Sequence, residues 1–213
     1  MNAVLLFGHS NAGKSPLGAL IERRASSPAR RFRHLDFGEH LRMVLAGSFD
    51  AGLSDGDKAY VRTVMNGGLL DDAHFPVARR IIEAFISGRG CRSGNDALVL
   101  NGIPRHMGQA RGLAAMGVKA EAIIYLRCPA GVAYERKVRA DKGAGHEDRS
   151  RRDDADIDIF KRKIVSFELE TAPLIDWYQS QGAKVLTIDV TTEMTPAEMY
   201  ERFRSLGAQE FKI

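Results

Sequence analysis

Gly8-His9-Ser10-Asn11-Ala12-Gly13-Lys14-Ser15 is the stretch that decides the fold, because it satisfies the phosphate-loop pattern G-x-x-x-x-G-K-[ST]. The strand-like residues 2–7 (NAVLLF) precede this match, and residues 16–24 follow it with the pattern of a helix. In such a context, backbone N–H groups at the helix N-terminus form a concave site for phosphate. The stretch therefore predicts a binding site for a nucleoside triphosphate.

The chemistry of a triphosphate explains the residue types in this loop. We expect Lys14 to reach the β- and γ-phosphates and the Ser15 hydroxyl to ligate Mg²⁺. Pro16 is unusual directly after the serine, but the first turn of a helix tolerates proline because that N–H has no intrahelical partner. The ATP-binding residues predicted in the loop are Gly8, Asn11, Ala12, Gly13, Lys14 and Ser15.

Outside the loop, short apolar runs alternate with longer amphipathic stretches, which is typical of an α/β protein with a parallel sheet. Strands are predicted at residues 3–7, 32–35, 97–100, 122–126 and 184–188, all short enough to be buried on both faces. Helices are predicted to start near Gly13, Asp72, Arg105, Pro129, Asp153 and Pro196. With the phosphate loop, this predicts one P-loop NTPase domain over residues 1–213, built as a three-layer α/β/α fold around a five-stranded parallel sheet.

Two segments do not fit the alternation. Residues 37–68 are polar and interrupted by glycine, with helical fragments but no central strand. Residues 140–152 carry charge and glycine without a hydrophobic anchor. We expect both to be excursions from the sheet rather than independent domains.

The composition excludes several other classes of protein. The 213 residues are 44% hydrophobic with a net charge of +4, which argues against disorder, and their apolar runs are too short to span a membrane. The N-terminal residues lack the basic region and cleavage pattern of a signal peptide. Cys91 and Cys128 are too few for a disulfide framework. We expect a soluble, cytoplasmic protein that binds neither membrane nor nucleic acid.

The remaining motifs resemble the adenylate kinase family of nucleoside monophosphate kinases, in its short-lid form. The blocks that carry this resemblance are HLDFGEHLR (34–42), GGLLDD (67–72), LVLNGIPRHMGQA (98–110) and a block over 149–182 that contains RRDD and TAPLIDWY. They occur in the family's order and extend nearly from end to end. The resemblance implies that residues 37–68 form a lobe that binds the monophosphate and that residues 140–152 form a short lid.

For the acceptor nucleotide, the resemblance places Arg42 and Arg105 on the monophosphate and Gln109 on the edge of the base. Phe37 and Gly38 belong to the same predicted site, and Phe37 stands where many relatives have a small residue beside the base. That departure leaves the identity of the base open.

For the donor nucleotide, the resemblance carries the family's paired lid arginines onto Arg151 and Arg162. Arg139 is a further candidate for ATP binding, and Arg136 lies close enough in sequence to take its place. Transfer between two anionic substrates requires cations on both sides, and forked guanidinium groups suit that purpose. The predicted catalytic residues are Lys14, Arg105, Arg151 and Arg162.

Asn101 departs from the family, which has an acidic residue at this strand end that helps organise the water shell of Mg²⁺. An amide can accept a hydrogen bond from a bound water but brings no negative charge. The predicted Mg²⁺ site is therefore Ser15 together with Asn101 or Asp36, acting through water.

The expected activity is transfer of the γ-phosphoryl group of MgATP to a nucleoside monophosphate by a monomer, with AMP favoured because Gln109 is present. Two alternatives remain open. One is a kinase of a small metabolite, of the shikimate or gluconate kinase type, in which Asp36 would bind or deprotonate a hydroxyl. The other is a nucleotide-binding regulatory module with weak catalysis, which Asn101 and Pro16 motivate.

Overall fold

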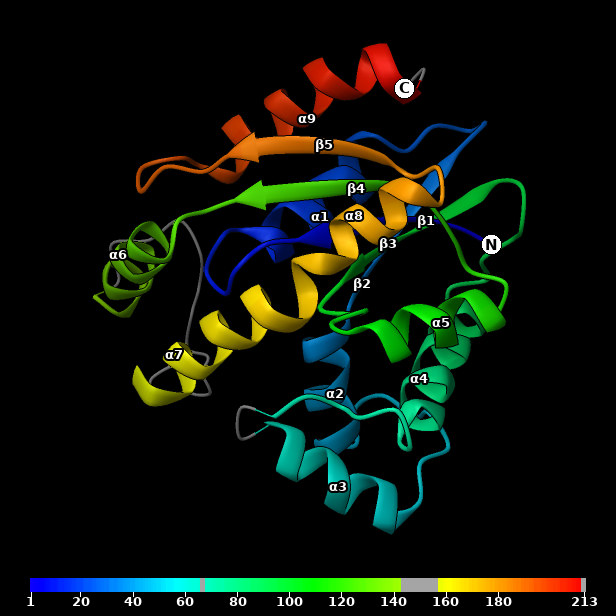
Figure 1. Ribbon diagram of the computed structural model, residues 1–213. Helices are drawn as coiled ribbons and strands as arrows, with labels where there is room; N and C mark the ends of the chain where they lie inside the picture. The colour runs from blue at the N-terminus through cyan, green and yellow to red at the C-terminus, as the bar shows by residue number, and fades with distance from the viewer. Residues whose placement is uncertain (66–67, 143–156, 212–213) are drawn as a thin grey trace.

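A five-stranded parallel sheet in the order β2-β3-β1-β4-β5 forms the centre of the computed structural model, which describes residues 1–65, 68–142 and 157–211 (Figure 1). The strands are β1 (Asn2–Phe7), β2 (Arg31–Asp36), β3 (Asp96–Asn101), β4 (Lys119–Arg127) and β5 (Lys184–Asp189). All five predicted strands are confirmed, and each extends beyond its predicted bounds. The extensions add polar residues such as Asp36 and Asn101, which join the backbone ladder but fall outside an apolar run.

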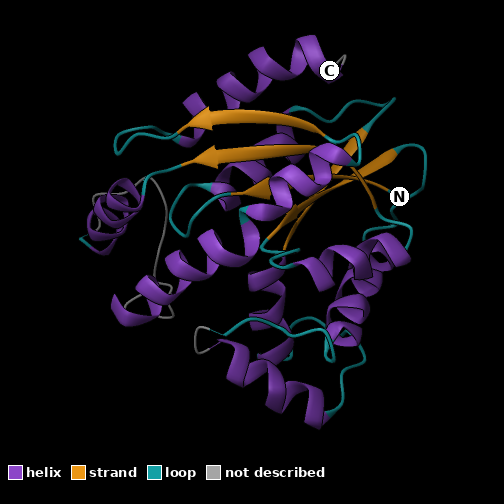
Figure 2. Ribbon diagram, viewed as in Figure 1, coloured by secondary structure: helices purple, strands orange, loops and turns teal. Residues whose placement is uncertain are grey.

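Helices make up most of the remaining structure (Figure 2). They are α1 (Lys14–Arg24), α2 (Phe37–Leu45), α3 (Asp55–Met65), α4 (Phe75–Gly88), α5 (Met107–Ala115), α6 (Ala130–Asp141), α7 (Ile157–Ser166), the π-helical segment η2 (Phe167–Thr171), α8 (Pro173–Ser180) and α9 (Pro196–Phe211). Within the described ranges, no helix combines the length and apolar character needed to cross a membrane.

Several helix starts differ from the prediction. Helix α4 begins at Phe75 rather than near Asp72, because the Asp71 carboxylate accepts a hydrogen bond from the His74 N–H at 2.9 Å and holds a turn there. Helix α5 begins after Arg105, which stays in the preceding turn. The predicted start at Asp153 lies outside the described residues, and the sequence prediction lacks both η2 and α8.

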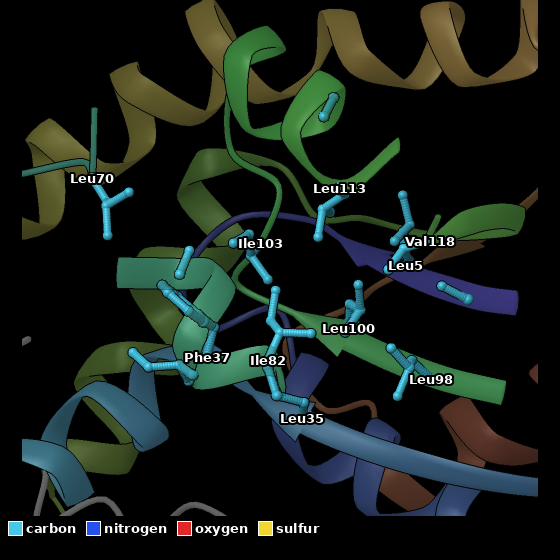
Figure 3. Close-up of a cluster of buried hydrophobic side chains, with 14 of the residues drawn as sticks. Leu5, Leu35, Phe37, Leu70, Ile82, Leu98, Leu100, Ile103, Leu113 and Val118 are labelled. Carbon is cyan, nitrogen blue, oxygen red and sulfur yellow. The ribbon is translucent and has the colours of Figure 1, made fainter. Parts of the chain in front are cut away.

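Two hydrophobic clusters lie on opposite faces of the sheet and make the fold a three-layer α/β/α sandwich. Alternate residues of β1 separate into them, with Leu5 in one cluster and Leu6 in the other. Helices α1 and α9 cover the Leu6 face, and α4, α5 and α8 cover the Leu5 face. Figure 3 shows the cluster that contains Leu5, in which Ile82 of α4 and Leu113 of α5 meet the strand leucines. The predicted fold class is confirmed.

The register of the sheet decides which polar residues meet. Because all strands are parallel, their carboxyl ends lie at the same edge, where ligands bind in open α/β sheets. Asp36 pairs with Asn101, and Asn101 pairs with Leu6, two residues before the phosphate loop. The ends of β1, β2 and β3 therefore bring the loop, a carboxylate and an amide together.

At the opposite edge, Asp96 fastens β2 to β3. Its carboxylate has no exposed surface and lies 2.6 Å from Arg31 Nη2 and 3.2 Å from Arg33 Nε. It also accepts a hydrogen bond from the Arg92 N–H at 2.7 Å. Burial opposes the charged form, but the hydrogen bonds from Arg31, Arg92 and Arg33, together with the charge of Arg31, outweigh burial and lower the pKa of Asp96.

We expect Asp96→Asn to lower the free energy of unfolding at pH 7 by about 2–3 kcal/mol, because it leaves two arginines without their buried anion. A lowered pKa in the folded state stabilises the protein above the unfolded-state pKa near 4, and this contribution is lost as the pH falls through the folded-state value. Urea denaturation from pH 7 to pH 2 should therefore show a shallower acid loss in the variant. Asp176→Asn, at an exposed carboxylate of α8, is the control, and an equal effect of both changes would contradict this account.

Candidate active site

The phosphate loop joins β1 to α1 through two glycines that no other residue could replace without strain. Gly8 has φ +146°, and a Cβ there would lie 2.7 Å from the Leu126 carbonyl oxygen. Gly13 has φ +101°, and a Cβ there would lie 2.8 Å from Met199 Sδ. Gly13 also caps α1 without any side-chain hydrogen bond, so the first N–H groups of this helix face the loop.

Side chains of Lys14 and Arg136 hold the backbone of this loop. The Lys14 ammonium donates to the carbonyl oxygens of Gly8 at 2.8 Å and His9 at 2.7 Å. Asn11 has φ +66°, and its carbonyl oxygen accepts a hydrogen bond from Arg136 Nε at 2.9 Å. The loop is therefore fixed from inside by its own lysine and from outside by an arginine of α6.

Ser15, Asp36 and Asn101 form a hydrogen-bonded triad at the ends of three elements. Ser15 Oγ donates to Asp36 Oδ2 at 2.5 Å, and Asn101 Nδ2 lies 3.0 Å from both of these oxygens. The other Asp36 oxygen accepts from the Glu39 N–H at 3.0 Å and caps α2. Asp36 thus connects the end of the phosphate loop to the first turn of the segment that follows β2.

One continuous cavity runs from the phosphate loop to the helices beyond β2. The predicted site residues that line it are Gly8, Lys14, Ser15, Asp36, Phe37, Gly38, Arg42, Arg105 and Gln109. The predicted residues within the described ranges that do not line it are Asn11, Ala12, Gly13, Asn101, Arg139 and Arg162. The charged lining residues in the described part of the chain are Lys14, Arg42, Arg105, Lys163 and Asp36. This excess of cations favours polyanionic ligands.

The side of the cavity away from the loop is braced by hydrogen bonds to the backbone. Gln109 Oε1 accepts from the Arg105 N–H at 2.7 Å, and Gln109 Nε2 donates to the Leu70 carbonyl at 2.8 Å. Gln109 is only 2% exposed, so it fixes the turn that carries Arg105. Arg42 is oriented by Glu39, whose Oε2 lies 2.7 Å from Arg42 Nη2.

Among the arginines predicted to bind the donor nucleotide, those that the structure describes do not line the cavity. Arg139 pairs with Glu193 away from the cavity, whereas Arg136 contacts the phosphate loop. Arg162 is exposed, and its neighbour Lys163 lines the cavity, because successive residues of an α-helix point about 100° apart. Arg151 and most of the predicted lid lie outside the described residues.

Three cavity residues of the helical stretch from α7 to α8 were not predicted from the sequence. Lys163, Phe167 and Thr171 recur at intervals of four and reach the cavity from one side. This spacing, read together with the TAPLI motif, is the signal that would have located them.

The triad is the part of the site that fits a magnesium ion. The Ser15 hydroxyl and the Asp36 carboxylate are hard donors of the kind that Mg²⁺ prefers, directly or through water, and the Asn101 amide nitrogen holds both of them in place. In the part of the chain that the structure describes, no group of three or more His, Cys, Asp or Glu residues forms another metal site.

The known proteins that this chain resembles include kinases. No family model matches the chain. The adenylate kinase of Methylorubrum populi is 29% identical over 187 residues, 84% of each chain, and that of Brucella ovis is 26% identical over 202 residues, 92% of each chain. Among solved structures, shikimate kinase from Acinetobacter baumannii in complex with shikimate has a TM-score of 0.47 and 14% identity, covering 99% of this chain and 94% of that one.

The three-layer fold, the phosphate loop and the matches over 82% to 92% of the chain define a P-loop kinase. The chain is similar to adenylate kinases, at 25% to 29% identity over 82% to 92% of its length.

Proposed function

We propose that the chain transfers the γ-phosphoryl group of MgATP to the phosphate of a nucleoside monophosphate, with AMP as the preferred acceptor. The observation that carries this proposal is the cavity that joins Lys14 and Ser15 of the phosphate loop to Arg42 and Arg105. Two separated sets of cations in one cavity fit two phosphorylated substrates brought end to end.

The proposed roles follow from this division. Backbone N–H groups of the loop and the Lys14 ammonium bind the donor phosphates, while Arg42 and Arg105 bind and orient the acceptor phosphate. A phosphate acceptor is already anionic, so the reaction needs alignment and charge neutralisation rather than a strong base. Arg151 and Arg162 would complete the donor side from residues 140–152 and the helix that follows.

We also propose that residues 37–68 form a lobe for the acceptor and that residues 140–152 form a lid. Residues 37–68, which contain α2 and α3, would hold the acceptor, with Phe37 and Gly38 beside the base. Closure of such segments over the substrates excludes water, which would otherwise compete as the acceptor.

Mg²⁺ is the proposed cofactor, which Ser15 would hold together with Asp36 or Asn101 acting through water. When bound, it would supply positive charge that helps to neutralise the donor phosphates. Asp36 provides the negative charge of this set, and Asn101 orients Asp36 and Ser15 through the hydrogen bonds of its amide.

The metabolite-kinase alternative would use Asp36 to bind or deprotonate a substrate hydroxyl. Both Asp36 oxygens already accept hydrogen bonds, from Ser15, Asn101 and the α2 backbone. Such a carboxylate is better suited to a fixed structural and metal-binding role than to proton abstraction. The pair of arginines on the far side of the cavity also favours an acceptor phosphate.

The test is ADP formation by the purified protein with MgATP and AMP, CMP, UMP, GMP or dTMP. We expect AMP to give a kcat/KM at least about tenfold above every other acceptor. Lys14→Ala protein purified in parallel controls for contaminating kinases, and a reaction without acceptor measures ATP hydrolysis. Shikimate and gluconate form a second arm of the same assay.

Each contrary result has a defined meaning. Transfer to shikimate or gluconate alone would establish the metabolite kinase. ATP binding in calorimetry without transfer to any acceptor would establish the regulatory module. Preference for CMP or UMP would retain the reaction and reject AMP.

A further inference from the structure

His9 of the phosphate loop makes a side-chain contact that the proposed chemistry does not use. His9 is only 4% exposed, and its Nε2 lies 2.7 Å from Glu168 Oε1 of the π-helical segment η2. Phe167, the preceding residue of η2, packs on the same ring with centroids 4.5 Å apart. Two consecutive residues of η2 therefore contact the second residue of the loop.

The state of the His9 ring agrees with this contact. Burial lowers the pKa of His9, Lys14 acts in the same direction, and Glu168 opposes the shift. A neutral imidazole carries one N–H, which Nε2 donates to Glu168. Nδ1 is then the acceptor nitrogen, and it has no hydrogen-bond partner among the described residues.

The other end of η2 contacts the acceptor side. Thr171 Oγ1 donates to the Arg105 carbonyl oxygen at 2.8 Å, and Thr171 is 4% exposed. The backbone between the two ends is fixed by the π-type bond from the Ala172 N–H to the Phe167 carbonyl at 2.8 Å. Phe167 and Thr171 also line the cavity between these contacts.

We infer that η2 is a positioning bridge, which sets the distance between the phosphate loop and the Arg105 turn through the His9–Glu168 and Thr171–Arg105 contacts. The inference rests on the proposed kinase activity for its effect on rate. A shift of about 1 Å between reacting groups can lower a rate by about 10²-fold. Loss of the bridge should therefore reduce kcat and leave the KM values nearly unchanged, since each substrate keeps its own cations.

The experiment compares three single variants in η2. Glu168→Ala removes the contact to His9, Glu168→Gln keeps an oxygen acceptor for the same N–H, and Glu170→Ala removes a second exposed carboxylate of the segment as the matched control. We expect Glu168→Ala to lower kcat about tenfold with both KM values within twofold. Glu168→Gln should recover most of this loss, and Glu170→Ala should match the unmodified protein.

A double-mutant cycle tests whether the two contacts act as one unit. Thr171→Val keeps the shape of the side chain and removes its hydrogen bond to Arg105. If η2 is a bridge, the double variant Glu168→Ala/Thr171→Val loses little more activity than the worse single variant. Losses that simply multiply would overturn the bridge, as would unchanged kcat in Glu168→Ala.

Hydrogen exchange of backbone amides gives a readout that does not depend on activity. Glu168→Ala and Thr171→Val should each raise exchange in both residues 8–15 and residues 102–109. Glu170→Ala should raise exchange in neither segment. If each variant affects only the segment that it contacts, η2 holds two independent contacts and the inference is wrong. If the exchange pattern is coupled but no nucleotide accepts phosphate, the bridge stands and the proposed function fails.

Discussion

Lys14→Ala is expected to lower kcat by about 10³-fold while the protein remains folded. Lys14 is the loop cation of the cavity, and its ammonium is already held at the rim by the carbonyls of Gly8 and His9. Removing one preorganised donor from a site where charge develops costs about 10²–10³ in rate, and P-loop catalysis depends almost wholly on such donors. Single-turnover kinetics with saturating AMP, compared with ATP binding by calorimetry, would separate the loss in transfer from a loss in binding.

Lys119→Ala is the matched control for this change. Lys119 is exposed at the start of β4, at the edge of the sheet opposite the loop, so its removal should leave kcat unchanged. Lys14→Arg adds a second variant that keeps the charge and moves its position. A Lys14→Ala enzyme within tenfold of the unmodified kcat would contradict the placement of the donor phosphates at this loop.

Single substitutions at positions 36 and 101 should lower activity, and the double variant that exchanges the two residues should restore it. We expect Asp36→Asn to lower kcat about 10²-fold and to raise the Mg²⁺ concentration for half-maximal rate, because the triad loses its negative charge. Asparagine also caps helices, so α2 should keep its first turn.

Asn101→Asp alone should lower kcat about tenfold. The Asn101 amide nitrogen lies 3.0 Å from Asp36 Oδ2, so a carboxylate there would bring two negative charges together and raise the pKa of one of them. The double variant Asp36→Asn/Asn101→Asp restores one charge and one amide, and we expect it to regain activity to within a few-fold of the unmodified protein.

Titration of rate against Mg²⁺ concentration for all four proteins checks this exchange. Asp50→Asn, at a carboxylate away from the cavity lining, controls for a general loss of negative charge. Full activity of Asn101→Asp would mean that the site tolerates a second carboxylate and that the hydrogen bond of the amide has no role. If the double variant is as inactive as Asp36→Asn, the negative charge works only at position 36 of β2 and not at position 101 of β3.

The fold and the loop could be predicted because they depend on local patterns. A short apolar run and a glycine-lysine loop are each set by residues close in sequence, so the five strands and the start of α1 follow directly. Asp36 and Asn101 could be named as candidates from their places at strand ends. Their mutual hydrogen bond could not, because it depends on the parallel register of β2 and β3.

The sequence did not predict which residues of α7 face the cavity, because this depends on the rotation of the helix about its axis. The motifs named Arg162, but the lining residue is Lys163, and the difference is a rotation of one residue around α7. The π-helical turn that follows changes the number of residues per turn, which shifts the phase of every residue before it relative to TAPLI. No sequence periodicity of 3.6 reports such a turn.

The buried Asp96 at the amino edge of the sheet has a consequence for how this protein can change over time. Its ion pairs with Arg31 and Arg33 secure β2 and β3 at one edge, while every residue proposed to meet a substrate from these strands lies at the other edge. A lineage can therefore replace residues around the cavity, including those beside the acceptor base, without loosening the strands that carry them. Selection for a new acceptor and selection for a sound scaffold would act on different ends of the same two strands.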